Sequence, residues 1–219
     1  FVKSKIFFLH AHAYDAFPPT APLASPGGIC YTGSIKYREE YLMDMTEKML
    51  HTQELYAGRI IHVRRDEVLL PNGHTSIREV VEHPGGVGIL ALEEDGNVLL
   101  VRQYRYAFGR TLLEIPAGKR ERGEDPLTTA RRELREETGA TAEEWTPLGS
   151  LIASPGCYDE VLYLFLARGL HFGDTDPDED EFLSLERIPL EKLVQRCMSG
   201  EITDAKTVCA ALKAKILQL

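Results

Sequence analysis

The most constraining feature of the sequence is a helix whose ends and buried face can be read from residues 125–139. Asp125 is a favourable N-cap, and Pro126 occupies the first helical position, where proline is preferred. Gly139 stands where a residue in the left-handed conformation commonly ends a helix. The apolar stripe expected of a packed helix is formed by Leu127, Ala130 and Leu134. We therefore expect a helix over 126–138 that packs on a hydrophobic layer.

Short apolar runs on both sides of this helix predict that layer to be a sheet. Residues 87–92 and 98–104 flank a turn at 94–97 and predict a hairpin. Further strands are expected at 112–115, 145–152 and 161–167, and further helices at 190–198 and 204–217. Strands and helices mixed in this order predict an α/β layered domain.

A separate β segment precedes this domain. Strand-like runs at 56–65, 66–70 and 75–82 surround an Asn72-Gly73 turn, which is a strong hairpin signal. The pattern breaks at 83–86. We expect residues 46–84 to form a small β subdomain and residues 85–219 to form the main domain. Residues 1–45 lack periodicity and are expected to be a poorly structured N-terminal extension.

The charge balance excludes some partners. The chain has 34 acidic and 25 basic residues, a net charge of -9. Residues 1–45 hold four of each sign, so the excess lies in residues 46–219. This argues against nucleic acid and anionic membranes as partners, because both require positive potential. Four scattered cysteines are typical of reduced thiols in a cytoplasmic protein, and we expect that location.

Three glutamates of the predicted helix share one face. Glu133, Glu136 and Glu137 stand at i, i+3 and i+4. Like charges at this spacing destabilise a helix by roughly a few tenths of a kcal/mol per pair. A solvated acidic face is one interpretation. The other is a site for a hard divalent cation, since Mg²⁺ and Mn²⁺ prefer carboxylate and carbonyl oxygens.

The context of these glutamates favours the second interpretation. The stretch reads Gly, five residues, Glu, seven residues, Arg-Glu, an aliphatic residue, one residue, Glu-Glu, one residue and Gly. It resembles the signature of the Nudix hydrolases at Gly118, Glu124, Arg132, Glu133, Leu134, Glu136, Glu137 and Gly139. The one departure is Ala140, a packing position where the family usually has a larger aliphatic residue.

The resemblance covers most of residues 47–219 and is to the ADP-ribose pyrophosphatase branch. It rests on the segments 101–106, 113–118, 154–156 and 200–205. It implies a Nudix-type α/β/α sandwich with a mixed sheet, preceded by a small antiparallel β subdomain that is used in a homodimer. The implied reaction is hydrolysis of ADP-ribose, or a related ADP-sugar, to AMP and a sugar phosphate. The implied cofactor is Mg²⁺, with Mn²⁺ as a possible substitute.

The resemblance also implies roles for particular residues. The metal ligands would be Glu133, Glu137, Glu136 and the backbone carbonyl of Ala117. Arg132 would orient the helix carboxylates through charge-assisted pairs. The substrate-binding candidates are Arg105, which suits bidentate phosphate contacts, Glu114 as a supporting acid, and Arg102 as a weaker candidate.

The general base is expected outside the helix. Residues 174–181 contain six acids, and their position is similar to that of the family's catalytic loop. Glu179 and Glu181 are equal candidates there, and Glu160 is their rival. A solvated acidic loop without a catalytic role is the alternative interpretation of this stretch.

Two other functions remain open. The substrate could be another nucleoside diphosphate compound, such as GDP-mannose, a flavin cofactor or a dinucleotide, because the metal chemistry would be the same. The chain could instead be a ligand-sensing Nudix module without catalysis. Intact signature acids and an acidic main domain argue against that second reading.

Overall fold

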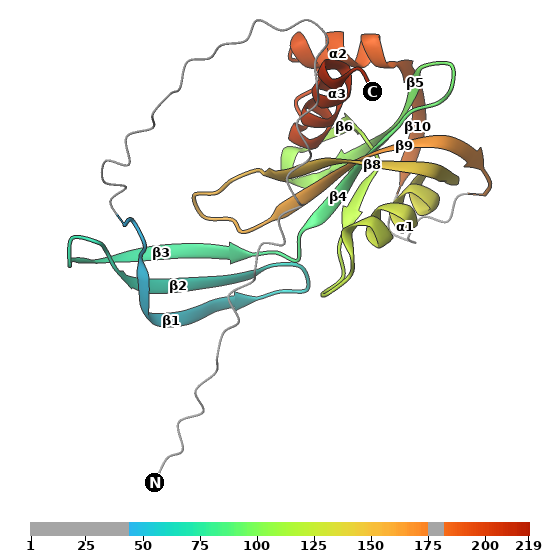
Figure 1. Cartoon of the computed structure of the whole chain (residues 1–219). Coiled ribbons are helices and arrows are strands. Elements are labelled where there is room, and N and C mark those ends of the chain that lie inside the picture. Colours follow the sequence, from blue (N-terminus) through green and yellow to red (C-terminus); the bar gives the residue numbers. More distant parts are fainter. Residues whose placement is uncertain (1–43, 175–181) are drawn as a thin grey trace, which may run out of the picture. The chain divides into compact units, whose positions relative to one another are not determined.

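The computed structural model describes residues 44–174 and 182–219 (Figure 1). The predicted extension at 1–45, apart from its last two residues, and the candidate bases Glu179 and Glu181 lie outside the described residues. In chain order the elements are β1 Lys48–Ala57, β2 His62–Leu69, β3 Thr75–Glu82, β4 Gly86–Ala91, β5 Asn97–Arg105, the 3-10 turn η1 Tyr106–Phe108, β6 Arg110–Glu114, β7 Ala117–Lys119, α1 Pro126–Thr138, β8 Ala140–Ile152, β9 Val161–Phe172, β10 Leu183–Pro189, α2 Leu190–Met198 and α3 Ala205–Leu217.

The first three strands form an antiparallel sheet in the order β1-β2-β3. The turn after β2 and the bounds of β3 agree with the sequence prediction. The predicted strand at 56–65 is wrong, because the Gly58 amide donates to the Ile61 carbonyl and closes a turn inside it. Strand β1 was not predicted. All ten of its residues are exposed, so it lacks the buried face that produces a period of two.

The remaining strands form two further sheets. One is mixed, in the order β7-β4-β9-β8, with β4 parallel to β9; the other is antiparallel, in the order β10-β5-β6. The predicted hairpin of 87–92 with 98–104 is therefore wrong. Its two strands belong to different sheets and meet only at the bridge between Leu92 and Val98. The local turn brings the strand ends together, whereas distant strands decide which sheet each one joins.

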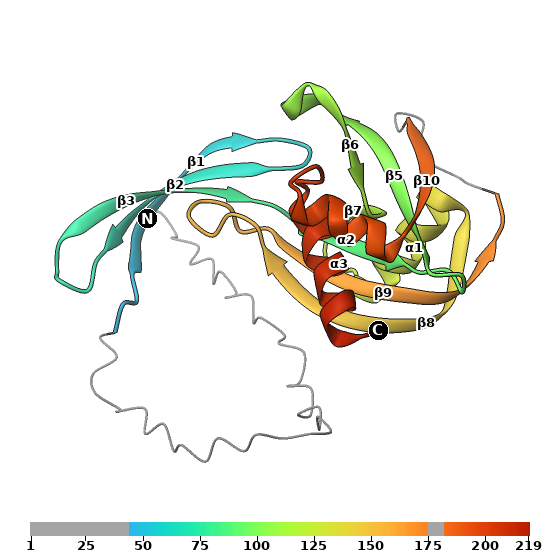
Figure 2. The ribbon, with the colours of Figure 1, turned by 90° about the horizontal axis from the view of Figure 1, so that it is seen from above.

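Helices cover both faces of the mixed sheet, which confirms the predicted α/β class. Alternate residues of β4 point to opposite sides: Ile89 joins a buried cluster with Leu134 of α1, and Leu90 joins a cluster with Leu193 of α2 and Ala211 of α3. Figures 1 and 2 show α1 and the α2–α3 pair on opposite sides of β8 and β9. A strand buried on both faces reads as a continuous apolar run, as β4 does.

The helix that the sequence specified most fully has the predicted bounds. The Asp125 carboxylate accepts a hydrogen bond from the Thr128 amide at 3.0 Å. Gly139 ends α1 with φ at 69°, in the left-handed region where glycine carries no Cβ penalty. Helix α2 also has its predicted bounds, and α3 begins one residue later than predicted.

The end of β3 is joined to the loop before β9. The Val81 amide donates to the Cys157 carbonyl at 2.7 Å, and the Asp159 amide donates to the Val81 carbonyl at 3.1 Å. The His83 amide donates to the Asp159 carboxylate at 2.7 Å. These bonds fix the backbone just before Glu160, one of the candidate bases.

Among the helices of residues 44–174 and 182–219, none is both long enough and apolar enough to span a membrane.

Ile89 provides a test of the doubly covered sheet. It is fully buried in the middle of β4. We expect Ile89→Ala to lower the free energy of unfolding by about 2–5 kcal/mol, because it leaves a cavity between α1 and the sheet. Urea denaturation measures the change. The control Ile216→Ala, at an exposed position of α3, should change stability by less than about 0.5 kcal/mol. Equal losses in the two variants would contradict the assignment of β4 to the core.

Candidate active site

Two of the three signature glutamates on α1 are buried. Glu133 is 8% exposed and Glu137 is 4% exposed, although both are carboxylates on a helix surface. Both lie against the β7 segment rather than in solvent. The Ala117 amide donates to Glu137 Oε2 at 3.0 Å, which joins α1 to the start of β7. The buried carboxylate oxygens of α1 therefore lie against the backbone of β7, which has carbonyl oxygens of its own.

The glycine at 118 is required by the position of Glu133. A Cβ added at residue 118 would overlap the carboxylate carbon and both oxygens of Glu133. Glycine permits this close approach without displacing the Glu133 carboxylate. The first residue of the signature thus has a physical explanation, which the sequence comparison alone did not supply.

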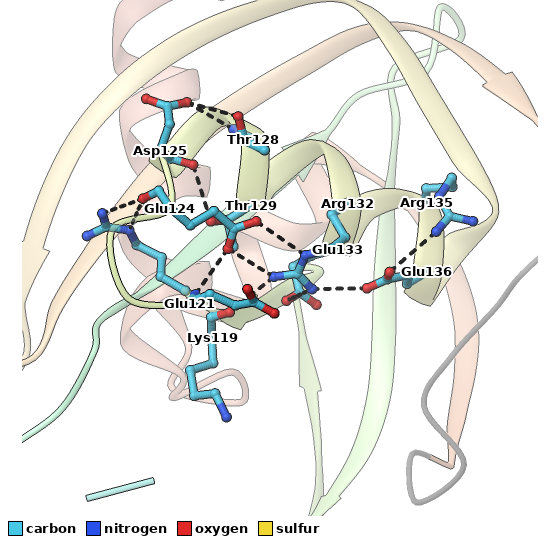
Figure 3. Close-up of polar contacts among 11 residues, drawn as sticks. Lys119, Glu121, Glu124, Asp125, Thr128, Thr129, Arg132, Glu133, Arg135 and Glu136 are labelled. Atoms are coloured by element: carbon cyan, nitrogen blue, oxygen red, sulfur yellow. Dashed lines mark hydrogen bonds and ion pairs between the residues drawn. The ribbon is translucent and has the colours of Figure 1, made fainter.

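Arg132 connects the signature acids to one another (Figure 3). Its Nη1 donates to Glu133 at 2.7 Å and to Glu136 at 3.1 Å, and its Nη2 donates to Glu124 at 3.3 Å. Nη2 also donates to the Lys119 carbonyl at 3.3 Å. Burial opposes the charge of this guanidinium, yet its carboxylate neighbours raise its pKa above the ordinary value for arginine. One cation thereby contacts three of the acids.

A second charged cluster lies at the end of β6. Glu114 is 1% exposed, and Arg105 donates to it twice, from Nε to Oε1 and from Nη2 to Oε2, each at 2.7 Å. The ammonium of Lys206 contacts Glu114 Oε2 and lies 2.8 Å from Asp204 Oδ1. Burial alone would raise the pKa of Glu114, but the two cations hold it below its usual value. Glu114 is therefore an ionised carboxylate inside the protein.

The two arginines predicted to bind substrate lie in different surroundings. Arg105 interacts electrostatically with Glu137 as well as with Glu114, so its charge lies near the signature helix. Arg102 forms an ion pair with Glu186 of β10 at 2.5 Å. The structure brings Arg105, and not Arg102, to the buried acids of β6 and α1.

Glu160 is the one candidate base within the described residues. Its carboxylate lies 3.3 Å from Nδ1 of His83. Burial raises its pKa, the charge of Lys206 lowers it, and Asp159 raises it again, with a net increase above the ordinary value.

Sequence reasoning missed Lys206, Asp204 and His83. Lys206 is 8% exposed at the second position of α3. A lysine in a helix is normally read as solvated, so composition and periodicity gave no reason to select it. The signal available in the sequence was Asp204, an N-cap residue type two positions before Lys206. In the structure its carboxylate caps α3 by accepting a hydrogen bond from the Thr207 amide at 3.0 Å.

The donors of α1 and β7 fit a hard divalent cation in their chemistry. Buried carboxylates and backbone carbonyls are the oxygen donors that such cations prefer. The space that a side chain at 118 would fill is occupied by a carboxylate. Within 44–174 and 182–219, no three His, Cys, Asp or Glu side chains form a ready cluster that could hold a metal. The described side chains of the signature helix could therefore provide at most part of a ligand set.

Comparison with known families identifies the fold and its signature. The family model described as the NUDIX domain matches residues 82–209. The chain belongs to the Nudix hydrolase family. A second model, described as the nucleoside diphosphate sugar hydrolase N-terminal domain, matches residues 47–81. The family predicted from the glutamate and glycine spacing is confirmed.

Curated relatives of this Nudix hydrolase match most of its length. A methanol dehydrogenase activator from Bacillus methanolicus is 43% identical over 75% of this chain and 90% of that protein. ADP-ribose pyrophosphatases from Bacillus subtilis and Mycobacterium tuberculosis are 41% and 39% identical, over 77% and 74% of this chain and 92% and 80% of theirs. A solved structure of an ADP compounds hydrolase shares the fold, with a TM-score of 0.70 at 23% identity, covering 78% of this chain and 93% of that one.

Gly118→Ala tests the packing of Glu133 in this Nudix hydrolase. The added methyl group should displace the carboxylate, so we expect weaker Mn²⁺ binding by isothermal titration calorimetry and a lower hydrolytic rate. Gly173→Ala is the matched control, because among the described residues a Cβ there would meet only the Gly139 carbonyl, at an ordinary 3.8 Å. Unchanged Mn²⁺ affinity in Gly118→Ala would show that the position of Glu133 does not depend on glycine.

Proposed function

We propose that this Nudix hydrolase cleaves the pyrophosphate bond of ADP-ribose, or a related ADP-sugar, with water to give AMP and a sugar phosphate. The observation that carries the proposal is the intact set of signature acids, buried against Gly118 and held by Arg132. Two relatives named ADP-ribose pyrophosphatase, each aligned over about three quarters of this chain, support the choice of substrate. A non-catalytic sensing module would have no need to retain these acids.

We propose Mg²⁺ as the cofactor, with Mn²⁺ as a substitute. Glu133, Glu137, Glu136 and the Ala117 carbonyl would hold it. When bound, such a cation neutralises phosphate charge and lowers the pKa of a coordinated water. Arg132 keeps the glutamate side chains in one orientation, which limits the reorganisation needed for binding.

We propose that Arg105 binds a phosphate of the substrate. Glu114 holds its Nε and Nη2, while its Nη1 donates no hydrogen bond to the part of the chain that the structure describes. A guanidinium fixed in this way is ready to contact an oxyanion without losing much side-chain freedom. Arg102 is the weaker candidate because Glu186 already pairs with it.

Glu160 is a candidate for the base that removes a proton from the attacking water. The pKa of Glu160 is raised toward neutral pH, and a carboxylate with a higher pKa is a stronger proton acceptor. Glu179 and Glu181 stay candidates for the same role, and they lie outside the described residues. Substitution of each by glutamine would separate the three.

We propose that the β1-β2-β3 sheet forms a homodimer interface. The exposed apolar side chains of this sheet and its turns are Met49, Leu50, Leu55, Tyr56, Ile60 and Ile77. So many exposed large apolar side chains on one three-stranded sheet favour its use as a protein interface. The resemblance to the ADP-ribose pyrophosphatase branch implies that this subdomain is used in a homodimer, so the partner we propose is a second copy of the chain.

A substrate panel tests the proposed function. Purified protein with Mg²⁺ is incubated with ADP-ribose, GDP-mannose, a flavin dinucleotide and dinucleoside polyphosphates, and the products are separated by chromatography. We expect AMP and ribose 5-phosphate from ADP-ribose, at the highest kcat/KM of the panel. Preferred hydrolysis of GDP-mannose, the substrate named for several relatives at 33% identity, would replace the proposed substrate. No turnover of any compound would contradict the enzymatic function.

Glu137→Gln tests the role of the signature acids. The variant removes a charge and keeps the shape and an oxygen acceptor for the Ala117 amide. We expect kcat to fall by at least the roughly 10–100-fold that supporting residues of metal sites cost, with unchanged thermal stability. Glu144→Gln, at an exposed position of β8, is the control and should keep full activity. Full activity of Glu137→Gln would remove Glu137 from the metal site.

Leu55→Glu tests the homodimer. Burying a charge in an apolar interface is unfavourable, so we expect the variant to elute as a monomer in size-exclusion chromatography with light scattering, while the parent protein elutes as a dimer. Ile216→Glu places the same charge at an exposed apolar residue of α3 and should leave the dimer intact. A dimeric Leu55→Glu variant or a monomeric parent protein would contradict this interface.

A further inference from the structure

Lys206 is a buried lysine that neither the signature nor the fold requires. It is 8% exposed, and its ammonium contacts Glu114 and lies 2.8 Å from Asp204. Burying an ammonium is costly unless it is paired, and a buried ion pair is often no more stabilising than apolar residues of the same size. The cap of α3 also does not need it, because Asp204 accepts directly from the Thr207 amide and hydroxyl. A role beyond stability would account for its presence.

The contacts of Lys206 fix a carboxylate that in turn fixes an arginine. Arg105 binds Glu114 with two parallel hydrogen bonds, and Lys206 contacts the same Oε2 from α3. A carboxylate held by two cations on different elements has little freedom to rotate. Because the Arg105–Glu114 pair is bidentate, the plane of the guanidinium follows the plane of the carboxylate.

Lys206 also sets the charge of this cluster. With Lys206 present, the charges of Arg105 and Lys206 balance those of Glu114 and Asp204. Without it, the cluster would carry one net negative charge next to the acidic face of α1. An anionic phosphate that approaches Arg105 would then meet repulsion from the residues around it.

We propose that Lys206 is a positioning residue for substrate binding, which acts through Glu114 to orient Arg105 toward a phosphate and to cancel the excess negative charge around it. This proposal rests on the proposed function, in which Arg105 contacts the pyrophosphate. Lys206 itself touches no substrate. Its effect therefore belongs to binding of the phosphate, and metal binding at α1 is independent of it.

Three lysine variants separate positioning from stability. Lys206→Met keeps the apolar stem and removes the charge, while Lys206→Arg keeps the charge. Lys213→Met is the matched control on the same helix, where the lysine donates to the Leu148 carbonyl at 2.6 Å. For each purified protein, kcat and KM for ADP-ribose at saturating Mg²⁺, Mn²⁺ affinity and thermal stability are measured.

Lys206→Met should raise KM by at least about tenfold, the loss expected when a charge-assisted hydrogen bond to the substrate is weakened. Its KM should change more than its kcat, since the charge of Lys206 also acts on the candidate base Glu160, and its Mn²⁺ affinity should be unchanged. Lys206→Arg should recover most of the KM. Lys213→Met should keep the parent KM, whatever it does to thermal stability.

A double variant tests whether Lys206 acts through Arg105. Arg105→Gln should raise KM, and adding Lys206→Met to it should raise KM little further, because the residue to be positioned is already lost. Independent, multiplying effects on KM would overturn the proposal. A parent-like KM in Lys206→Met would also overturn it and leave the proposed function intact, whereas a parent protein without turnover would overturn both.

Lys206→Met could lose its fold because it leaves Glu114 with one buried partner fewer. The variant Glu114→Gln/Lys206→Met removes both buried charges and avoids this loss. It should fold with a raised KM, since the amide that replaces the carboxylate can accept only one of the two Arg105 hydrogen bonds. A folded double variant with the parent KM would overturn the proposal.

Discussion

The close approach of Glu133 to the backbone at Gly118 is the constraint on which the site depends. A side chain at 118 would occupy the position of the carboxylate, so Glu133 could not keep its place against β7. Glu137 completes the same contact by accepting the Ala117 amide. The signature therefore encodes a packing arrangement as well as a set of acids. Burial keeps these carboxylates close to the backbone carbonyls with which they would share a cation.

The acids near that contact keep their charge because cations pair with them. Arg132 holds the acids of α1, and Arg105 with Lys206 holds Glu114. Without these cations, burial would raise the pKa values of the carboxylates and favour their neutral form. The net charge of -9 is thus compatible with an anionic substrate, because the acids near the site are balanced locally or are available to metal.

Local signals in the sequence predicted the elements whose first and last residues are marked by capping residues. Helix α1 has its cap, proline and terminal glycine within fifteen residues, and its bounds were predicted correctly. Strand β1 was missed because an exposed strand has no apolar alternation. The pairing of β4 with β5 was predicted wrongly, since a turn signal reports proximity of two strand ends and not the sheet that each strand enters.

The sequence by itself determined the family, the α/β class and the signature acids, because these depend on local patterns and on the spacing of residues along the chain. Only the tertiary structure placed Lys206 beside Glu114, ninety-two positions away in the chain, and separated Arg105 from Arg102. Those relations depend on how α3 and β10 pack against β5 and β6. Electrostatic pairing acts through space, so residues distant in sequence set the charge of the site, and no local pattern records them.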